Sequence, residues 1–262
     1  MPELPEVENR LLYLQATALG HAIDRVEVSE PRIVKCCSAD TFKRRLKGRR
    51  MVSATRRGKY LVVGLDNGRI LLLHFTMGGD LKYYRDPADK PRYSRFELVL
   101  DNGYRLAFTC PRNICRVMVV DSISQIPGLR DMGPEPLGDE FTIDRLRQIL
   151  SASPNRRIKP FLMDQNKIAG IGNIYADEIL FGTHIRPTRA AGGLSKTETR
   201  LLYNSIRKIL GEAIATGGEE EFPATYLISR ESRGVGCPRC GHEIEKTTVG
   251  GRTTRHCPIC QR

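Results

Sequence analysis

Apolar positions near the start of the chain recur at helical spacing. Within residues 6–19 they are Val7, Leu11, Leu14 and Ala18, and Gly20 follows them. This pattern predicts an amphipathic helix that buries one face and ends at the glycine.

From about residue 23 to residue 120 the apolar pattern becomes that of β-strands. Short apolar runs such as Tyr60–Leu65 are separated by polar turns. Asn67-Gly68 and Asn102-Gly103 each stand between two such runs, which is a strong hairpin signal. We expect a mainly antiparallel β-sandwich or flattened barrel in this region.

Helical periodicity returns after residues 127–139, a stretch rich in proline and glycine that predicts a linker. Within residues 140–218, Ser195 and Glu198 form a capping-box pattern before a long amphipathic helix. Earlier, Gly170-Ile171-Gly172-Asn173 opens a helix predicted over 174–181. Amides at such a helix start can hold a phosphate, but an ordinary helix–helix turn is the commoner reason for two close glycines.

The C-terminal tail carries two Cys-x-x-Cys pairs with sixteen residues between them. The four cysteines are Cys237, Cys240, Cys257 and Cys260. Thiolates at this spacing predict one structural zinc ion, and so short a tail needs the ion to fold. A redox function is the less favoured alternative, because thioredoxin-like proteins use a single pair. A glycine-tipped hairpin between the pairs is expected to present Arg252.

The other cysteines lack such spacing. Cys36, Cys37, Cys110 and Cys115 are expected to be free thiols, and His242 or His256 could replace a cysteine ligand only as a minor alternative. The predicted fold class is α+β and multidomain. Its segments are residues 1–126 (a helix plus an antiparallel β-sandwich), 127–139 (linker), 140–218 (helical) and 219–262 (connecting segment and zinc finger).

The charge balance points to a partner. The 262 residues contain 42 Lys+Arg and 30 Asp+Glu, giving a net charge of +12 and a pI of about 9.5. This excess favours a polyanion such as nucleic acid, although a merely soluble basic protein is the alternative. Tryptophan is absent and aromatic residues are 6%, so an open base-stacking platform is not expected. No run of apolar residues is long enough to span a bilayer, and no signal peptide is evident, which predicts an intracellular protein, cytoplasmic or nucleoid-associated.

Candidate chemistry lies in the first residues. Removal of Met1 would leave Pro2 with a free secondary amine, and Glu3 and Glu6 follow on one helical face. An amine beside carboxylates suits Schiff-base formation with an aldehyde-like carbon. A helix start with proline and acidic residues in its first turn is the alternative explanation.

Four motifs stand in one order along the whole chain. They are the Pro2-Glu3 start, Gly58-Lys59-Tyr60 at a strand start, the turn Gly170-Ile171-Gly172-Asn173, and the four-cysteine tail. In this combination the chain resembles the bifunctional DNA glycosylase/AP lyases of the formamidopyrimidine-DNA glycosylase and endonuclease VIII superfamily. The start PELPEVE is similar to the formamidopyrimidine branch. The resemblance implies a helix–two-turn–helix domain, a zinc finger, damaged double-stranded DNA as partner, and a monomer.

The resemblance also implies roles for single residues. Pro2 would attack C1′ of the damaged nucleoside, Glu3 would assist base loss and proton transfer, and Glu6 would organise that site. The other catalytic positions are Lys59 (proton shuttle and phosphate contact), Arg252 (phosphate grip at the finger tip) and Glu178 (active-site side). The DNA-binding positions are His74, Met77, Arg95, Arg112, Ile114, Lys159 and Asn173. A Schiff base at C1′ acidifies the 2′ hydrogens, so β-elimination and then δ-elimination can cut the strand.

Some positions depart from the family pattern and bear on substrate choice. Met77, Arg112 and Ile114 would fill the gap left by an everted base, with Ile114 where phenylalanine is usual; core packing is the alternative for Met77 and Ile114. CPRNIC at residues 110–115 replaces a DPRRFG-type loop, and Arg95 replaces a histidine, so opposite-base selectivity is expected to be relaxed.

The segment of 18 residues over 219–236 is shorter than the one that caps an everted 8-oxoguanine in the family, and its acidic run Glu219-Glu220-Glu221 is expected to be a solvated loop. We therefore expect a monomeric zinc-containing glycosylase/AP lyase of base excision repair that removes formamidopyrimidines or related oxidised bases. The alternatives are an endonuclease VIII-like preference for oxidised pyrimidines or single-stranded DNA, and a non-catalytic protein that binds damaged DNA.

Overall fold

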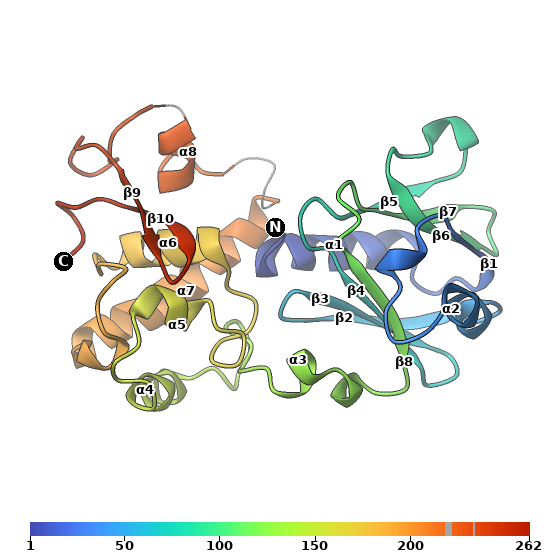
Figure 1. Ribbon diagram of the computed structural model, residues 1–262, viewed down its shortest axis with the longest axis horizontal. Helices are drawn as coiled ribbons and strands as arrows, with labels where there is room; N and C mark the ends of the chain where they lie inside the picture. Colours follow the sequence, from blue (N-terminus) through green and yellow to red (C-terminus); the bar gives the residue numbers. More distant parts are fainter. Residues whose placement is uncertain (218–221, 233) are drawn as a thin grey trace. The chain divides into compact units, whose positions relative to one another are not determined.

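The computed structural model describes residues 1–217, 222–232 and 234–262; the acidic run Glu219-Glu220-Glu221 lies outside this range. Contacts divide the chain into two compact units (Figure 1). The first comprises Met1–Pro2 and Glu6–Arg130, and the second comprises Glu3–Pro5 and Asp131–Arg262. The division after Arg130 falls within the stretch predicted as a linker, and the helical segment and the finger group together in the second unit.

The first unit contains two antiparallel sheets within the described residues, with strand orders β1-β6-β7-β5 and β2-β3-β4-β8. The strands are β1 Ile23–Val28, β2 Met51–Arg57, β3 Tyr60–Leu65, β4 Ile70–His74, β5 Asp80–Tyr84, β6 Ser94–Leu100, β7 Arg105–Thr109 and β8 Arg116–Val120. The two Asn-Gly turns join β3 to β4 and β6 to β7, with Gly68 and Gly103 at φ +80° and +79°. The predicted antiparallel sandwich is therefore confirmed.

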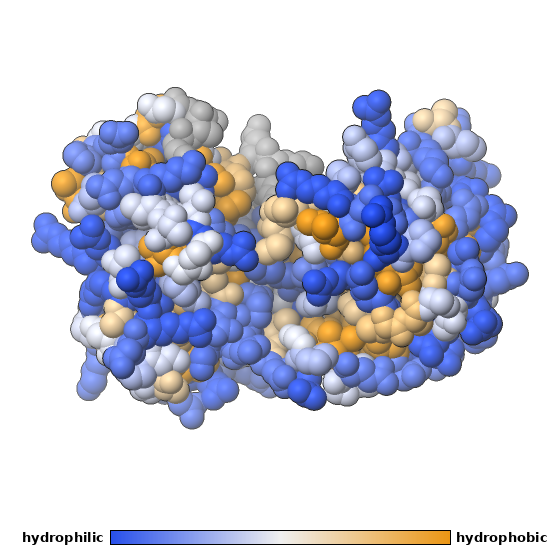
Figure 2. Space-filling view, viewed as in Figure 1, coloured by the Kyte–Doolittle hydropathy of each residue, from blue (hydrophilic) through white to orange (hydrophobic). Residues whose placement is uncertain are grey.

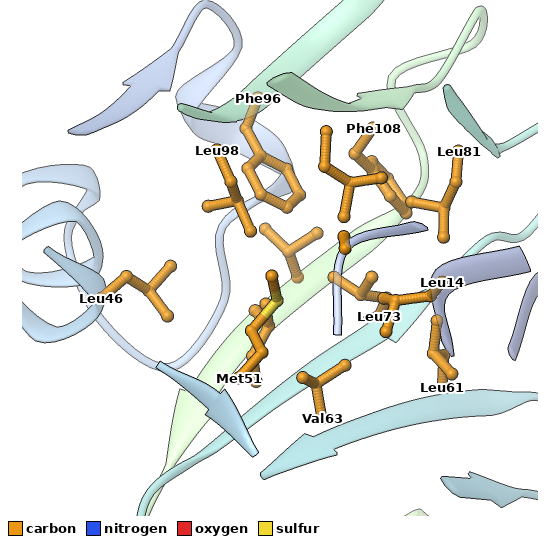
Figure 3. Close-up of a cluster of buried hydrophobic side chains, with 14 of the residues drawn as sticks. Leu14, Leu46, Met51, Leu61, Val63, Leu73, Leu81, Phe96, Leu98 and Phe108 are labelled. Carbon is orange, nitrogen blue, oxygen red and sulfur yellow. The ribbon is translucent and has the colours of Figure 1, made fainter. Parts of the chain in front are cut away.

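Two helices contribute to the core of the first unit. Figure 3 shows Leu14 of α1 (Leu4–Thr17) and Leu46 of α2 (Ala39–Leu46) pointing toward side chains from both sheets, among them Leu73 and Phe108. Burying a leucine of this kind contributes roughly 1.5–3 kcal/mol. Short helical turns complete the unit: η1 Pro31–Ile33, η2 Pro87–Asp89, η3 Ile123–Gln125 and α3 Pro127–Arg130.

Helix α2 was not expected within the strand region. The Ser38 hydroxyl accepts the N–H of Thr41 (3.2 Å), so it caps the helix start. Phe42 and Leu46, one turn apart, are fully buried. The sequence signal was thus a cap followed by two apolar residues, too short a pattern to separate from the surrounding strands.

The second unit is helical and ends in a hairpin. Its elements are α4 Ile143–Ser151, α5 Ile158–Leu162, α6 Asn173–Gly182, η4 Ala191–Gly193, α7 Lys196–Ala215, α8 Leu227–Ser232, β9 Glu245–Val249 and β10 Arg252–His256. Helix α7 begins with the predicted capping box, in which the Ser195 hydroxyl accepts the Glu198 N–H and the Glu198 carboxylate accepts the Ser195 N–H. Leu4 is buried in the core of this unit, with Phe161 and Tyr175.

The surface fits a protein rich in charged residues. On the face shown in Figure 2, hydrophilic residues predominate and apolar residues form separate patches. None of the helices in the described part of the chain has the length and apolar character that crossing a membrane requires.

Candidate active site

Glu3 lies against the start of helix α6. Its carboxylate accepts the N–H groups of Gly172 (2.7 Å), Ile174 (2.9 Å) and Tyr175 (3.3 Å), and the residue is only 3% exposed. The first N–H groups of a helix have no partner within it, and the helix dipole favours a negative charge there. We call this arrangement (Glu3, Gly170, Gly172, Ile174 and Tyr175) the Glu3 cradle.

The two glycines of the cradle are shaped to the N-terminal segment. A Cβ on Gly172 would collide with the Glu3 carboxylate, and one on Gly170 (φ +81°) would come within 2.7 Å of the Leu4 Cβ. The Leu4 N–H also donates to the Gly170 carbonyl (3.0 Å). The amides considered for a phosphate are therefore bound to a protein carboxylate, and the glycines permit that close approach.

Pro2 and Glu6 flank the part of the N-terminus that enters the cradle. Pro2 is buried, whereas Met1 is 47% exposed and its peptide bond occupies the Pro2 nitrogen. Glu6 is 2% exposed in the first turn of α1. A free amine at Pro2 therefore requires removal of an exposed methionine.

Lys59 and His74 belong to the sheet β2-β3-β4-β8 of the first unit. Lys59 follows Gly58 (φ +54°) in the turn between β2 and β3 and is 8% exposed. His74 ends β4 opposite Tyr60, and their rings lie 4.5 Å apart. Burial, and then the charges of Arg116 and Lys59, lower the pKa of His74 to about 4. The Nδ1 atom of the neutral ring is buried and has no hydrogen-bond partner among the described residues.

The predicted gap-filling side chains lie on two loops of the first unit, residues 75–79 and 110–115, which we call the wedge loops. Met77 is 41% exposed, Ile114 is 46% exposed, and Arg112 is exposed as well. Arg112 Nη1 lies 3.1 Å from the Met77 sulfur and donates a hydrogen bond to it. The core-packing alternative for Met77 and Ile114 is therefore wrong.

Arg95 supports one wedge loop through the backbone. Its Nε–H donates to the Cys110 carbonyl (3.0 Å), and its guanidinium lies 5.6 Å from the centroid of the Tyr93 ring. The side chain is partly exposed, so its other nitrogens remain able to contact DNA.

Arg252 opens strand β10 at the tip of the finger hairpin and is exposed. The tip is formed by Gly250 (φ +59°) and Gly251 (φ +72°). A Cβ on Gly250 would lie 2.6 Å from the Pro160 side chain, so the tip packs closely on helix α5.

The four tail cysteines form one cluster, with all their sulfurs within 4.8 Å of one another. Cys237 and Cys260 are separated by 3.8 Å between sulfurs, and Cys240 and Cys257 by 3.5 Å. Tetrahedral zinc with bonds of about 2.3 Å places its sulfurs about 3.8 Å apart. The cluster therefore fits a bound metal ion without a histidine ligand.

Comparison with known proteins decides the family. The family model described as the formamidopyrimidine-DNA glycosylase N-terminal domain matches residues 1–117, and that of the formamidopyrimidine-DNA glycosylase H2TH domain matches residues 132–222. The formamidopyrimidine-DNA glycosylase of Pelotomaculum thermopropionicum is 38% identical over 279 residues, which cover 100% of this chain and 99% of the relative. The chain belongs to the formamidopyrimidine-DNA glycosylase family.

Solved structures of the family agree over the full length. A complex of Lactococcus lactis Fpg with DNA containing an abasic site has a TM-score of 0.87, at 31% identity over 99% of both chains. A complex of the same Fpg with DNA containing FAPY-dG has a TM-score of 0.88, at 31% identity over 99% of this chain and 100% of the other. This protein is therefore a DNA glycosylase of base excision repair.

Within this glycosylase, Lys159 does not fit the DNA contact predicted for it. Its side chain is 0% exposed, and its Nζ lies 2.8 Å from Asp177 Oδ1 while donating to the Thr253 carbonyl (2.8 Å) and the Thr254 hydroxyl (2.9 Å). Asp177 also accepts the Arg255 N–H (3.0 Å). Lys159 and Asp177 thus attach the hairpin to helices α5 and α6.

Burial shifts the pKa values of the two members of this ion pair in opposite directions. It lowers the pKa of Lys159 and raises the pKa of Asp177 to about 6, while the attraction between the two charges opposes both shifts. Asp177 had no signal in the sequence, because one acidic residue on a helix predicts nothing about the segment that packs against it.

Glu178, predicted to act at the active-site side, binds backbone instead. Its carboxylate accepts the N–H groups of Leu227 (3.0 Å) and Ile228 (3.2 Å), at the start of α8. Burial raises the pKa of Glu178 to about 8, although these hydrogen bonds oppose the shift. In the glycosylase this residue holds a structural element in place.

Asn173 remains available to a ligand. It is the first residue of α6, and its Oδ1 is buried without a hydrogen-bond partner among the described residues. No hydrogen bond from a described residue to this oxygen therefore fixes the orientation of the amide.

Cys110 and Cys115 correct the expectation of free thiols. The structure joins them in a disulfide whose Cα atoms are 6.1 Å apart. Both residues are buried, at 0% and 1% exposure, at the base of the second wedge loop. Cys36 and Cys37 are free, as predicted.

Proposed function

We propose that this glycosylase is bifunctional, removing oxidised bases of the formamidopyrimidine type through Pro2 and then cutting the strand as an AP lyase. The observation that carries this assignment is the Glu3 cradle, which fixes a carboxylate in the residue directly after the proposed nucleophile. A catalytic group held this firmly reacts without first losing conformational freedom.

In this mechanism the Pro2 nitrogen, freed from Met1, bonds to C1′ while the base departs with a proton supplied with the help of Glu3. A proton delivered to O4′ then lets the C1′–O4′ bond break, which opens the sugar ring and makes C1′ the carbon of an iminium. This iminium acidifies the 2′ hydrogens. Loss of a 2′ proton expels the 3′ phosphate, and a second elimination expels the 5′ phosphate. Lys59 shuttles protons, Arg252 holds a phosphate, and Glu6 organises the site.

The wedge loops support action on duplex DNA. Met77, Arg112 and Ile114 expose the side chains needed to occupy the space of an everted base. FAPY-dG in the DNA of the Lactococcus lactis complex supports a formamidopyrimidine substrate. We propose that the protein acts as a monomer on nucleoid DNA, with His74, Arg95 and Asn173 as further DNA contacts.

Borohydride trapping on a duplex with one abasic site tests the chemistry. Protein that lacks Met1 should form a covalent adduct, because borohydride reduces an iminium to a stable amine. Pro2→Gly should trap far less, and a variant that traps equally would move the nucleophile elsewhere. If intact protein without Met1 forms no adduct, the lyase chemistry is refuted, and the protein only binds damaged DNA.

We further propose that the four-cysteine cluster binds one structural zinc ion. The ion would cross-link the tail through the four cysteines, while the hairpin and Arg252 provide the DNA contact. Elemental analysis should find about one zinc per chain. Cys257→Ser should lose the metal and most DNA affinity, whereas tight binding without metal would contradict this role.

A further inference from the structure

A cavity of about 530 Å³ lies beside the second wedge loop of the first unit. Its lining includes two cysteines, Cys36 and Cys115, and two basic residues, Lys35 and Arg116. Ile114 also lines it. Sulfur and positive charge therefore meet in a space large enough for a small organic molecule.

Cys110 and Cys115 form a disulfide, and one of these two cysteines lines the cavity. Cys115 is among the lining residues, whereas Cys110 is not among them. Cys110 is fixed by its backbone, since its N–H donates to the Tyr93 carbonyl (3.0 Å) and its carbonyl accepts from Arg95. Cys115 is thus the half of the disulfide that borders the cavity, and because it is 1% exposed, the loop over residues 110–115 has to move before a small molecule can reach its sulfur.

The same disulfide lies beneath both wedge loops. It closes residues 110–115, which carry Arg112 and Ile114, into a ring. Cys115 Sγ also lies 2.8 Å from the Phe75 carbonyl, at the start of the other loop. A Cβ on Gly79 would come within 2.9 Å of that sulfur, so the contact between the loops is close.

We propose that Cys110 and Cys115 form a reversible thiol–disulfide site that a small anionic thiol, or its disulfide, enters through this cavity. Lys35 and Arg116 favour a negatively charged reagent. The redox state sets the order of the loop that carries Arg112 and Ile114. The effect on DNA rests on the proposed function, whereas the exchange chemistry does not depend on it.

The exchange balances with a small organic disulfide, RSSR, as oxidant. The Cys115 thiolate attacks one sulfur of RSSR, forming a mixed disulfide and releasing one RSH once a proton is added. The Cys110 thiolate then attacks Cys115 Sγ and releases the second RSH. Two protein thiols are oxidised and one RSSR is reduced to two RSH; two RSH molecules reverse the sequence.

Ring closure should strengthen DNA binding. In the reduced form the loop has more conformations, and ordering Arg112 and Ile114 on DNA then carries a larger entropy loss. Immobilising two such side chains corresponds to a difference in Kd of about tenfold.

The exchange route is tested with oxidised glutathione, an anionic disulfide, in a Cys36→Ser/Cys37→Ser background. Adding Cys110→Ser should give a stable glutathionyl adduct, mapped to Cys115 by peptide mass spectrometry. Adding Cys115→Ser instead should leave Cys110 unmodified. Absence of the Cys115 adduct, or equal modification of the two residues, would overturn the route through the cavity.

The consequence for DNA is tested by comparing oxidised and phosphine-reduced wild type, with zinc content verified in both. Reduction should raise the Kd for a duplex with a tetrahydrofuran abasic analogue about tenfold. Cys110→Ser/Cys115→Ser should bind like the reduced protein under either treatment. Equal Kd values in both states, with borohydride adducts still formed, would overturn the switch and leave the proposed function standing. Loss of adducts in both states would instead refute the proposed function.

Discussion

Glu3 and Ile114 are both proposed to act on one damaged nucleotide, yet their surroundings differ in kind. Glu3 is 3% exposed and accepts three backbone N–H groups, while Ile114 is 46% exposed on a loop. The Glu3 cradle is specified by close contacts that leave no space for one more methyl group. The wedge loop over residues 110–115 is instead closed by a disulfide beneath side chains that reach solvent.

This difference predicts which changes each region tolerates. In the cradle, small changes of volume should disturb chemistry, because packed interiors relax only partly. In the wedge loops, side-chain changes should alter affinity with little effect on stability, because the changed atoms have few neighbours. Gly172→Ala and Ile114→Phe test this contrast directly, and variants of Lys159 and Glu178 extend it to two other buried groups.

Gly172→Ala should have the largest effect on activity. The added methyl collides with the Glu3 carboxylate, so Glu3 must move, and a misplacement of about 1 Å can reduce a rate about 10²-fold. Single-turnover cleavage of an abasic duplex measures this loss. The matched control is Gly211→Ala in α7, where a Cβ meets nothing within 4 Å; it should keep full activity and gain about 0.5–1 kcal/mol of stability. A fully active Gly172→Ala protein would show that the cradle does not fix the catalytic carboxylate.

Lys159→Ala should lower the free energy of unfolding by about 3–5 kcal/mol, because it leaves Asp177 buried without its partner. Lys159→Met/Asp177→Leu should recover most of the loss, since it removes both charges. Urea unfolding measures both variants. If Lys159 instead contacts a DNA phosphate directly, Lys159→Ala should leave stability unchanged. The slope of the logarithm of the binding constant against the logarithm of the salt concentration should then decrease by the contribution of about one phosphate contact.

Glu178→Gln should change how stability depends on pH. Burial raises the pKa of Glu178 from 4.5 to about 8, so the folded state holds its proton more tightly than the unfolded state. The resulting stabilisation is complete below the unfolded pKa and is lost as the pH rises through the folded one. Unfolding curves between about pH 5 and pH 8 should show wild type losing stability relative to the variant. Parallel pH profiles would mean that this carboxyl group keeps its ordinary pKa.

The sequence predicted the structure best where a local residue pattern has a single physical cause. The Asn-Gly turns, the capping box at Ser195 and the spacing of the four tail cysteines each lead directly to the structure observed. Lys159 and Glu178 were assigned by their place in a motif, and their burial depends on distant segments, the hairpin and α8, that no local pattern shows. Pairing of Cys110 with Cys115 likewise depends on how β7 and β8 bring the loop ends together.

Ile114→Phe should have the smallest effect and is the most specific to the wedge loops. At 46% exposure the larger ring meets few packed neighbours, so stability should change by less than about 0.5 kcal/mol. A ring that stacks on an exposed base contributes about 1 kcal/mol or more, which corresponds to about fivefold tighter binding of abasic-analogue duplexes. Fluorescence anisotropy against each opposite base measures this gain, and the preference among the bases should sharpen. Val52→Phe, a change at a similarly exposed apolar residue on β2, should leave affinity unchanged. If both variants tighten binding equally, the gain is nonspecific, and Ile114 does not enter the DNA at the lesion.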